Sequence, residues 1–318
     1  MKAQNSTLWH EVRGSLFWPA LFAGIGVWQL LATGNWFYLV NFGYIGLAIG
    51  IGDLLTRILP PKKKARGRKV TQLMVGLYML GFLGFLGREN MQIEGFFFYL
   101  LAGVFAGATL HYFIAKIVGP LIFGRAWCGW ACWTAMVLDF LPWTKPRAGR
   151  IRYLGVIRYA HLALSLLLVL FVSFILKNPL ERRDEFVWLI VGNLVYYSSS
   201  ILLAGVLKDN RAFCKYGCPI PPLQKLGARF SLMRIQADRG LCNECAACEK
   251  MCPMNIRLLE YIRRGKRILS TECILCQTCV RICPSQALKT TFKIDAGFRE
   301  YIHFGEPVGE REAGCVRR

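Results

Sequence analysis

Long apolar blocks separated by short polar connections dominate the first two thirds of the chain. Six of these blocks are each close to the roughly 20 residues that an α-helix needs to cross a bilayer. They span about residues 16–33, 36–59, 70–86, 96–123, 157–176 and 187–206. A soluble protein of 318 residues cannot bury six helices of this length. The pattern therefore predicts an α-helical membrane protein with a six-helix transmembrane bundle.

Basic residues gather between these blocks. The chain has 40 Lys and Arg against 19 Asp and Glu, a formal charge of +21. The second and fourth connections are strongly basic, whereas in the third Arg88 is opposed by Glu89 and Glu94. By the positive-inside rule, the basic connections and both termini are cytoplasmic, which predicts a multi-pass protein of the cytoplasmic (inner) membrane. Because this distribution accounts for the positive charge, we do not expect nucleic acid as a partner.

The strongest chemical signal follows the last apolar block. Two runs of C-x2-C-x2-C-x3-C-P stand in tandem, the spacing with which bacterial ferredoxins hold two [4Fe–4S] clusters. Three closely spaced thiolates can face only one side of a cubane, so the returning chain supplies the fourth corner. We expect crossed ligation, with Cys242, Cys245, Cys248 and Cys283 on cluster 1, and Cys273, Cys276, Cys279 and Cys252 on cluster 2.

Zinc and disulfide bonds explain this spacing less well. Zinc sites usually pair two C-x2–4-C units and use neither a third Cys in each run nor the trailing Pro. Disulfides need an oxidising compartment, whereas the predicted topology places this segment in the cytoplasm. The sequence therefore predicts a small α+β ferredoxin-like dicluster domain, closed by a strand within the run 287–294.

Two further cysteine pairs lie just past a predicted cytoplasmic membrane face. Each has the spacing C-x3-C: Cys128 with Cys132, and Cys214 with Cys218. On a helix, positions i and i+4 share one side, so each pair is expected to present two sulfurs together. A third redox centre, a transient metal site and a dithiol relay between quinone and clusters are all open interpretations. The alternative is that these are buried apolar cysteines, but the duplicated spacing favours function.

The predicted organisation has four parts. Residues 1–206 form the membrane domain with a cytoplasmic C-x3-C loop at 124–156, and residues 207–241 form a juxtamembrane link with the second pair. The dicluster domain covers 242–294, and a flexible tail with a lone Cys315 covers 295–318. We expect the basic side chains of the link, Lys225, Arg229 and Arg234, to lie against the anionic inner leaflet.

Ionisable groups near the spans are candidates for quinol chemistry. His161 and Asp139 are the preferred pair, because a neutral His accepts a proton near its ordinary pKa and a nearby carboxylate can release it. A plain interhelical hydrogen bond is the alternative. Haem ligation by His111 and His161 is less favoured, since their expected depths differ by about two helical turns.

These motifs resemble a known family. The segments 124–132, 213–219 and 228–235, together with the double ferredoxin run, are similar to the NapH/NosR/MauN group of membrane polyferredoxins. The resemblance covers about residues 124–290 and implies a quinol-dehydrogenase-type electron-transfer subunit of a respiratory reductase or maturation system. The copper reductase of cbb3-oxidase assembly is also similar, through both C-x3-C pairs and the ferredoxin part.

The leading hypothesis is an iron–sulfur protein that passes electrons between the quinol pool and a cytochrome-type or ferredoxin-type redox partner. A copper-reducing or cofactor-assembly factor is the first alternative, and it requires copper on the four C-x3-C sulfurs, since soft thiolates select Cu(I). A redox-sensing regulator is the second. The chain shows no phosphate-binding Gly-rich loop, nucleophile elbow or zincin helix.

Overall fold

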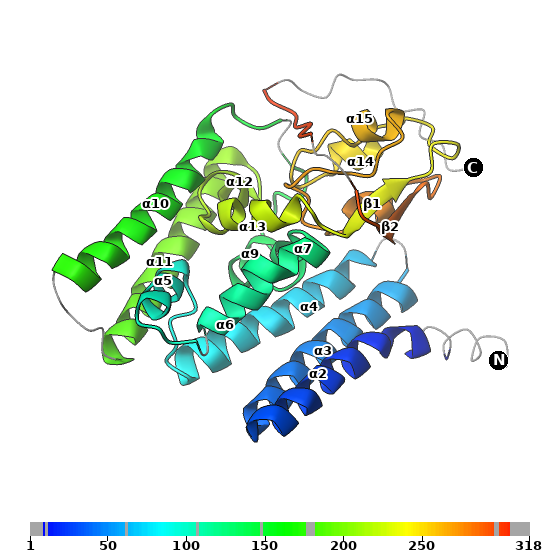
Figure 1. The fold of residues 1–318 in the computed structure, drawn as a ribbon. Coiled ribbons are helices and arrows are strands. Elements are labelled where there is room, and N and C mark those ends of the chain that lie inside the picture. Colours follow the sequence, from blue (N-terminus) through cyan, green and yellow to red (C-terminus); the bar gives the residue numbers. More distant parts are fainter. Residues whose placement is uncertain are drawn as a thin grey trace. The chain divides into compact units, whose positions relative to one another are not determined.

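The structure is a computed structural model that describes residues 9, 12–60, 63–105, 108–146, 149–175, 182–295 and 299–305. It is mostly helical (Figure 1), and the chain divides into two compact units. The first unit is Met1–Tyr78 with Trp130–Met136, and the second is Met79–Gly129 with Val137–Arg318. Within the described residues, five helices are long and apolar enough to cross a membrane: Val12–Thr33, Trp36–Ile58, Ala65–Leu86, Leu154–Ile175 and Asp184–Leu207. They correspond to five of the six predicted blocks.

The first unit begins with a helical hairpin. Helix α2 (Phe17–Thr33) ends at Gly34, whose φ of 68° is a left-handed conformation that glycine adopts at low cost. Helix α3 (Trp36–Ile58) starts at once, because the Asn35 side chain accepts a hydrogen bond from the Phe37 N–H at 2.9 Å. The two-residue connection therefore sets α2 against α3.

Helix α4 (Ala65–Leu77) lies against α3 at a glycine crossing. A Cβ on Gly52 of α3 would overlap Thr71 and the backbone of Gly67 on α4, so the helix backbones approach closely only because no side chain intervenes. The short helix α9 (Trp133–Leu138) reaches α4 in the same way, at Gly76. Small residues thus create the contacts of this unit.

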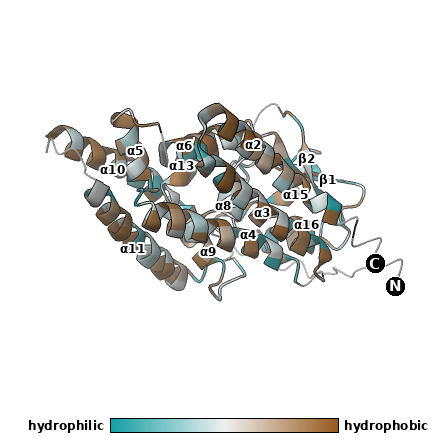
Figure 2. Ribbon diagram, turned by 90° about the horizontal axis from the view of Figure 1, so that it is seen from below, coloured by the Kyte–Doolittle hydropathy of each residue, from teal (hydrophilic) through white to brown (hydrophobic). Residues whose placement is uncertain are grey.

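Two long apolar helices stand out in the second unit. Helix α10 (Ile157–Leu170) follows a 3₁₀ turn at Leu154–Val156 and continues as a π-helix, Phe171–Ile175. Helix α11 (Arg182–Leu207) returns beyond it, and much of both helices is coloured as apolar in Figure 2. Many of their large apolar side chains are exposed, as expected for helices that face lipid.

In the described residues the fourth predicted span, 96–123, is not one continuous helix, so the sixth spanning helix is not confirmed. It is divided into α5, α6, the π-helix η2 and α7: Ile93–Leu101, Ala108–Tyr112, Phe113–Val118 and Gly119–Phe123. The ring of Phe96 in α5 stacks on that of Tyr112 in α6 with centroids 4.9 Å apart, so the chain folds back on itself. The π-helix η1 (Tyr78–Leu86) precedes this broken segment.

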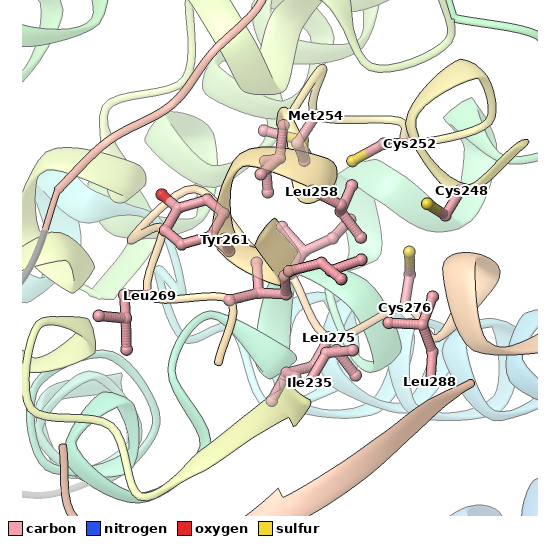
Figure 3. Packing of buried hydrophobic residues seen from close by; sticks show 14 of the residues in the cluster. Ile235, Cys248, Cys252, Met254, Leu258, Tyr261, Leu269, Leu275, Cys276 and Leu288 are labelled. Carbon is pink, nitrogen blue, oxygen red and sulfur yellow. The ribbon is translucent and has the colours of Figure 1, made fainter. Parts of the chain in front are cut away.

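The ferredoxin part is built on a two-stranded antiparallel sheet. Strand β1 (Met233–Ala237) pairs with β2 (Leu288–Phe292), with Ile235 opposite Thr290. The predicted closing strand is therefore present, and its partner comes from the predicted link. The core over the sheet includes Ile235, Leu258 and Cys276 (Figure 3). The short helices of this part are α14, α15 and α16: Ala247–Lys250, Leu258–Arg263 and Thr278–Ile282.

The link and the tail are more tightly packed than their sequence suggests. Helices α12 (Ala212–Tyr216) and α13 (Ile220–Ala228) fill the link. Arg234 is buried and donates to the Ser231 carbonyl at 3.0 Å, so the expectation that it faces lipid headgroups is wrong.

The described part of the predicted flexible tail, residues 299–305, also packs on the ferredoxin part. The Arg257 N–H donates to the Tyr301 carbonyl at 2.9 Å, and Ile302 forms a β-bridge with Ile256. This stretch therefore differs from the free tail expected there. Cys315 lies outside the described residues.

Candidate functional site

Two cavities in the ferredoxin part are each lined by four cysteines. The larger is lined by Cys252, Cys273, Cys276 and Cys279. The smaller is lined by Cys242, Cys245, Cys248 and Cys283. These are the two crossed sets expected from the sequence, and Figure 3 shows the Cys252 and Cys276 sulfurs within the surrounding apolar core. Each cavity has the donor set that a [4Fe–4S] cluster needs.

The backbone of the two cysteine runs carries the same costly conformation at equivalent positions. Residues without glycine's freedom adopt a left-handed φ just before and just after the middle cysteine: Glu244 and Ala246 in the first run, Leu275 and Gln277 in the second. Such residues cost free energy and persist where a site requires them. Alternating backbone conformations of this kind turn successive N–H groups towards one concavity, which suits an anionic iron–sulfur cluster.

Burial affects the protonation of the cysteines around the larger cavity. It raises the pKa of Cys252 to about 11 and that of Cys273 to about 12, and neighbouring cysteines add to the effect. These side chains are therefore thiols at neutral pH until iron displaces the proton. The cavity is suited to soft metal ligation rather than to surface thiol chemistry.

The first C-x3-C pair begins on a short helix that packs against the ferredoxin part. Cys128 lies in α8 (Ala126–Trp130), belongs to the same apolar cluster as Cys276, and donates its thiol to the Gln224 side-chain oxygen at 2.9 Å. A Cβ on Gly129 would overlap the Ile274 carbonyl. The α8 backbone therefore touches the loop that lines the larger cavity.

One arginine holds Cys214, the first cysteine of the second pair, beside Cys128. The Arg211 guanidinium donates to the Cys128 carbonyl at 3.2 Å and lies 3.9 Å from the Cys214 sulfur. It also pairs with Asp139 at 2.6 Å. Arg211 thus brings Cys128 and Cys214 together, and Asp139, which sequence reasoning assigned to proton release, anchors this arginine.

The second cysteine of each pair lies outside the helix that holds the first. Helix α8 ends before Cys132, which belongs to the first unit, and α12 ends before Cys218. The expectation of i and i+4 sulfurs on one helical face is therefore wrong. Among the described residues, no three His, Cys, Asp or Glu side chains are placed to hold a single metal ion.

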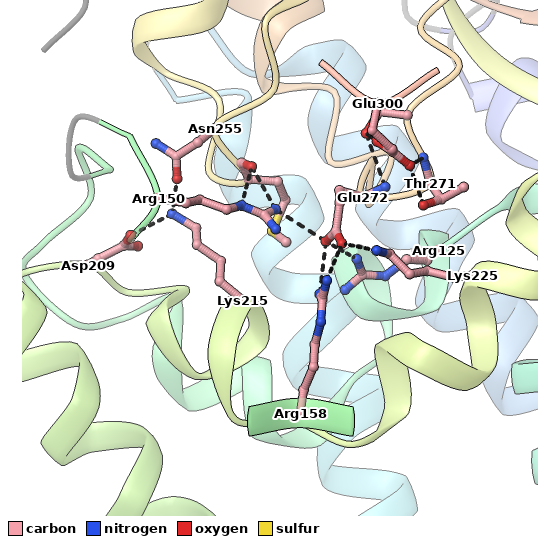
Figure 4. A network of polar contacts seen from close by, with 12 residues as sticks. Arg125, Arg150, Arg158, Asp209, Lys215, Lys225, Asn255, Thr271, Glu272 and Glu300 are labelled. Carbon is pink, nitrogen blue, oxygen red and sulfur yellow. Dashed lines mark hydrogen bonds and ion pairs between the residues drawn. The ribbon is translucent and has the colours of Figure 1, made fainter. Parts of the chain in front are cut away.

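A buried carboxylate next to the larger cavity collects four cations. Glu272 immediately precedes Cys273, and its side chain is 2% exposed. Its partners come from different segments (Figure 4): Arg125 at 2.7 Å, Arg150 at 3.2 Å, Arg158 of α10 at 2.7 Å and Lys225 of α13 at 2.7 Å. The Glu272 side chain therefore joins the loop of the larger cavity to the apolar helix α10 and to the segments that flank the C-x3-C cysteines.

The charge of Glu272 depends on these partners. Burial alone raises the pKa of this carboxyl, but Arg150, Arg125 and the other two cations outweigh burial and hold it well below its ordinary range. The ionised carboxylate therefore stabilises the fold at neutral pH, and that contribution is lost as the pH falls through the folded pKa. Sequence reasoning missed this centre. The signal that could have pointed to it is the position of Glu272 directly before Cys273.

The second C-x3-C segment also reaches the larger cavity. Lys215, next to Cys214, binds Asp209 at 2.5 Å and the Asn255 side chain (Figure 4). Asn255 follows Cys252 by three positions and has a left-handed φ of 54°. Both C-x3-C segments therefore contact loops that line the larger cavity.

The two histidines considered from sequence lie in different surroundings. His161 of α10 hydrogen-bonds through Nδ1 to the Gly217 carbonyl at 2.7 Å, directly before Cys218. His111 of α6 packs edge-on against Trp127 with ring centroids 4.8 Å apart. The structure thus connects His161, rather than His111, with the second cysteine pair.

Two iron–sulfur family models match the chain. A 4Fe-4S dicluster domain matches residues 214–288, and a 4Fe-4S binding domain matches residues 97–151. The ferredoxin-type protein NapH of Haemophilus influenzae is 27% identical over 202 residues, covering 59% of this chain and 68% of that protein. The methylamine utilization ferredoxin-type protein MauN of Paracoccus denitrificans is 28% identical over 186 residues, covering 54% and 63%. The protein is a membrane iron–sulfur electron-transfer protein of the NapH/MauN type.

A further relative matches over a longer stretch of the chain. An uncharacterised protein of Methanocaldococcus jannaschii is 26% identical over 230 residues, covering 70% of this chain and 85% of that protein. No solved structure matches. The dicluster model begins at Cys214 and so takes in the second C-x3-C pair and strand β1 of this NapH/MauN-type protein.

Gly129→Ala tests the contact between α8 and the larger cavity. The new methyl group would meet the Ile274 carbonyl, which cannot retreat without moving Cys276, so we expect loss or distortion of one of two cluster signals in the EPR spectrum of the reduced protein. Gly155→Ala is the matched control, because its nearest neighbour would be the Lys215 carbonyl at 3.7 Å. Two unchanged cluster signals in Gly129→Ala would contradict the contact.

Glu272→Gln tests the four-cation centre. Removing one partner of a buried ion pair typically costs about 3–5 kcal/mol, and here it leaves four cations without their carboxylate. We expect a clearly lower thermal unfolding midpoint in detergent at neutral pH. Glu260→Gln serves as control, since Glu260 pairs with the exposed Arg257 at 3.4 Å. Equal midpoints for the two variants would show that the centre contributes little.

Proposed function

We propose that the protein oxidises quinol in the membrane and passes the electrons through two [4Fe–4S] clusters to a cytochrome-type or ferredoxin-type partner. Cluster 2 is held by Cys273, Cys276, Cys279 and Cys252, and cluster 1 by Cys242, Cys245, Cys248 and Cys283. Each cluster supplies one-electron chemistry when bound. The chain's own residues bind the clusters, exclude water around them and set their distance from the membrane spans.

The contacts of the C-x3-C segments carry this proposal. Gly129 of the first segment touches the Ile274 carbonyl, and Lys215 of the second binds Asn255. Both contacts lead to loops of the same cavity, so cluster 2 is the proximal centre and the C-x3-C region is the route from the membrane. Arg125 adds a positive charge beside this route, since it lies within electrostatic range of Cys128 and Cys214.

Cluster 1 is the distal centre in this proposal. Asn243 and Glu244, between its first two cysteines, are exposed, whereas Ile274 and Leu275 at the equivalent positions of cluster 2 are buried. A redox partner can therefore approach cluster 1 more closely. With the basic connections at the cytoplasmic face, the partner docks inside the cell and both termini are cytoplasmic.

Cysteine variants in a one-cluster background test the crossed ligation. Cys242→Ser with Cys245→Ser removes cluster 1 and leaves cluster 2 as the only EPR-active centre. In that background we expect Cys252→Ser to change the remaining signal and Cys283→Ser to leave it unaltered, because only the former residue lines the larger cavity. The reverse result would mean that each run of four cysteines holds its own cluster.

Quinol-driven reduction tests the function itself. Anaerobically purified protein in detergent is mixed with menadiol or decylubiquinol, and cluster reduction is followed by visible absorbance and EPR. We expect reduction in the wild type and in Cys315→Ser, but not in Cys128→Ser or Cys214→Ser, all of which remain reducible by dithionite. Failure of both quinols in the wild type would refute quinol oxidation, and stoichiometric bound copper would then support the copper-reducing alternative.

A further inference from the structure

A group of polar side chains lies in the middle of the apolar helices of the second unit. Ser165 is midway along the apolar helix Leu154–Ile175, and Tyr196 is midway along Asp184–Leu207. Glu94 is bound to Ser165, although sequence reasoning placed it in a connection between spans. Ionisable and polar side chains at this depth are costly and mark functional sites.

We propose that Glu94, His161 and Tyr196 form the site where the quinol hydroxyl groups are hydrogen-bonded and deprotonated. This inference rests on the proposed quinol oxidation and assigns its residues. Glu94 and Tyr196 belong to no cysteine motif, and the resemblance to other proteins does not point to them. The case depends on three features: an unsatisfied carboxylate oxygen, a histidine of fixed tautomer, and a direct connection to the second cysteine pair.

Glu94 offers a proton acceptor inside the membrane region. Its Oε1 accepts a hydrogen bond from the Ser165 hydroxyl at 2.6 Å. Its Oε2 is buried and makes no hydrogen bond to any residue that the structure describes. Glu94 lies in the first turn of α5, whose chain is broken rather than spanning. Interrupted helices with polar groups at mid-depth are a recurring way to build substrate sites within membranes.

His161 lies one helical turn from Ser165 on the same side of α10. Its Nδ1 is 2.7 Å from the Gly217 carbonyl, which can only accept, so Nδ1 carries the proton. In the neutral ring, Nε2 is therefore the acceptor. A histidine held in this tautomer can take a proton from a substrate hydroxyl at neutral pH.

Tyr196 joins these groups to the cysteines. Its ring lies 5.5 Å from that of His161, and it packs in one apolar cluster with Cys214 and Cys218. The Tyr196 hydroxyl is buried and has no hydrogen-bond partner among the described residues. It also lies within electrostatic range of Glu94 and Cys218. The site thus has a hydroxyl, a carboxylate and an imidazole next to the route towards cluster 2.

The reaction balances with these groups. Both O–H bonds of the quinol break, one proton passes to the Glu94 carboxylate and one to His161 Nε2, and the quinone is released. Two electrons leave one at a time to the two oxidised clusters, which are the oxidants named in the proposed function. Tyr196 donates a hydrogen bond to a quinol oxygen and positions the ring.

A purely structural hydrogen bond between α5 and α10 makes a different prediction. Glu94→Gln keeps an oxygen that accepts from Ser165 and nearly the same volume, but it cannot take up a proton. If the contact is structural, this variant behaves as the wild type. If the carboxylate is a proton acceptor, the quinol reaction slows while the fold is retained.

The test measures quinol-driven and dithionite-driven cluster reduction in the full-length protein loaded with both clusters. With menadiol and decylubiquinol as separate probes, we expect Glu94→Gln and His161→Gln to reduce their clusters roughly a hundredfold more slowly than wild type, the usual contribution of a positioned acid or base. Dithionite-driven reduction, iron content and thermal unfolding should be unchanged. We expect a smaller slowing for Tyr196→Phe.

Glu185→Gln is the matched control. Glu185 also accepts from a hydroxyl of a neighbouring helix, that of Tyr99, but it lies in the first turn of α11, far along the helix from Tyr196. Its quinol rate should equal that of the wild type. If Glu94→Gln loses iron or unfolds, Ser165→Ala takes its place in the test. This variant frees the carboxylate without removing it, and it must slow the quinol reaction but not the dithionite reaction.

The outcomes separate the site from the function. If the wild type is reduced by quinol and both Glu94→Gln and His161→Gln match its rate, the site is refuted while quinol oxidation stands. If neither quinol reduces the wild type, the function fails and the site with it. Equal slowing of Glu94→Gln and the Glu185→Gln control would also overturn the assignment, because any membrane carboxylate would then produce the effect.

Discussion

The ion cluster around Glu272 is the constraint on which the architecture of the second unit depends. A carboxylate buried in this way is tolerated because four cations face it, and the buried Arg125 and Arg158 are in turn tolerated because they share it. Arg158 comes from an apolar helix and Glu272 from a cysteine run, so the cluster-binding part cannot separate from that helix without exposing several uncompensated charges.

Around this centre, the two cysteine runs are alike in backbone but unlike in surroundings. Both carry left-handed residues at equivalent positions, which shows that each is shaped for the same kind of group. The contacts of the C-x3-C segments, through Gly129 with the second run and through Lys215 with the end of the first, both lead to loops of the larger cavity. The repeated motif thus forms two similar cavities, and the packing around them differs.

Much of the cluster chemistry was predictable from sequence, because ligand spacing within one short cysteine run reflects local geometry. Five apolar helices were predictable because length and hydropathy suffice. The broken segment after η1 was not, since a chain that folds back has the same composition as one that crosses. The positions of Arg234 and Glu94 were not predictable either. A charged residue next to an apolar block is expected at the surface until its tertiary partner is known.

Strand β1 precedes the cysteine runs and β2 follows them, so their pairing joins the two ends of the ferredoxin part. Helix α13 comes shortly before β1 in the chain. A ferredoxin domain on a flexible linker would have to move between donor and acceptor, and its turnover would depend on the length of that linker. Here the ion pair between Arg158 of α10 and Glu272 joins the loop of the larger cavity directly to the apolar helix. Electron delivery should consequently be insensitive to solvent viscosity, with any diffusional step left to the docking of the partner.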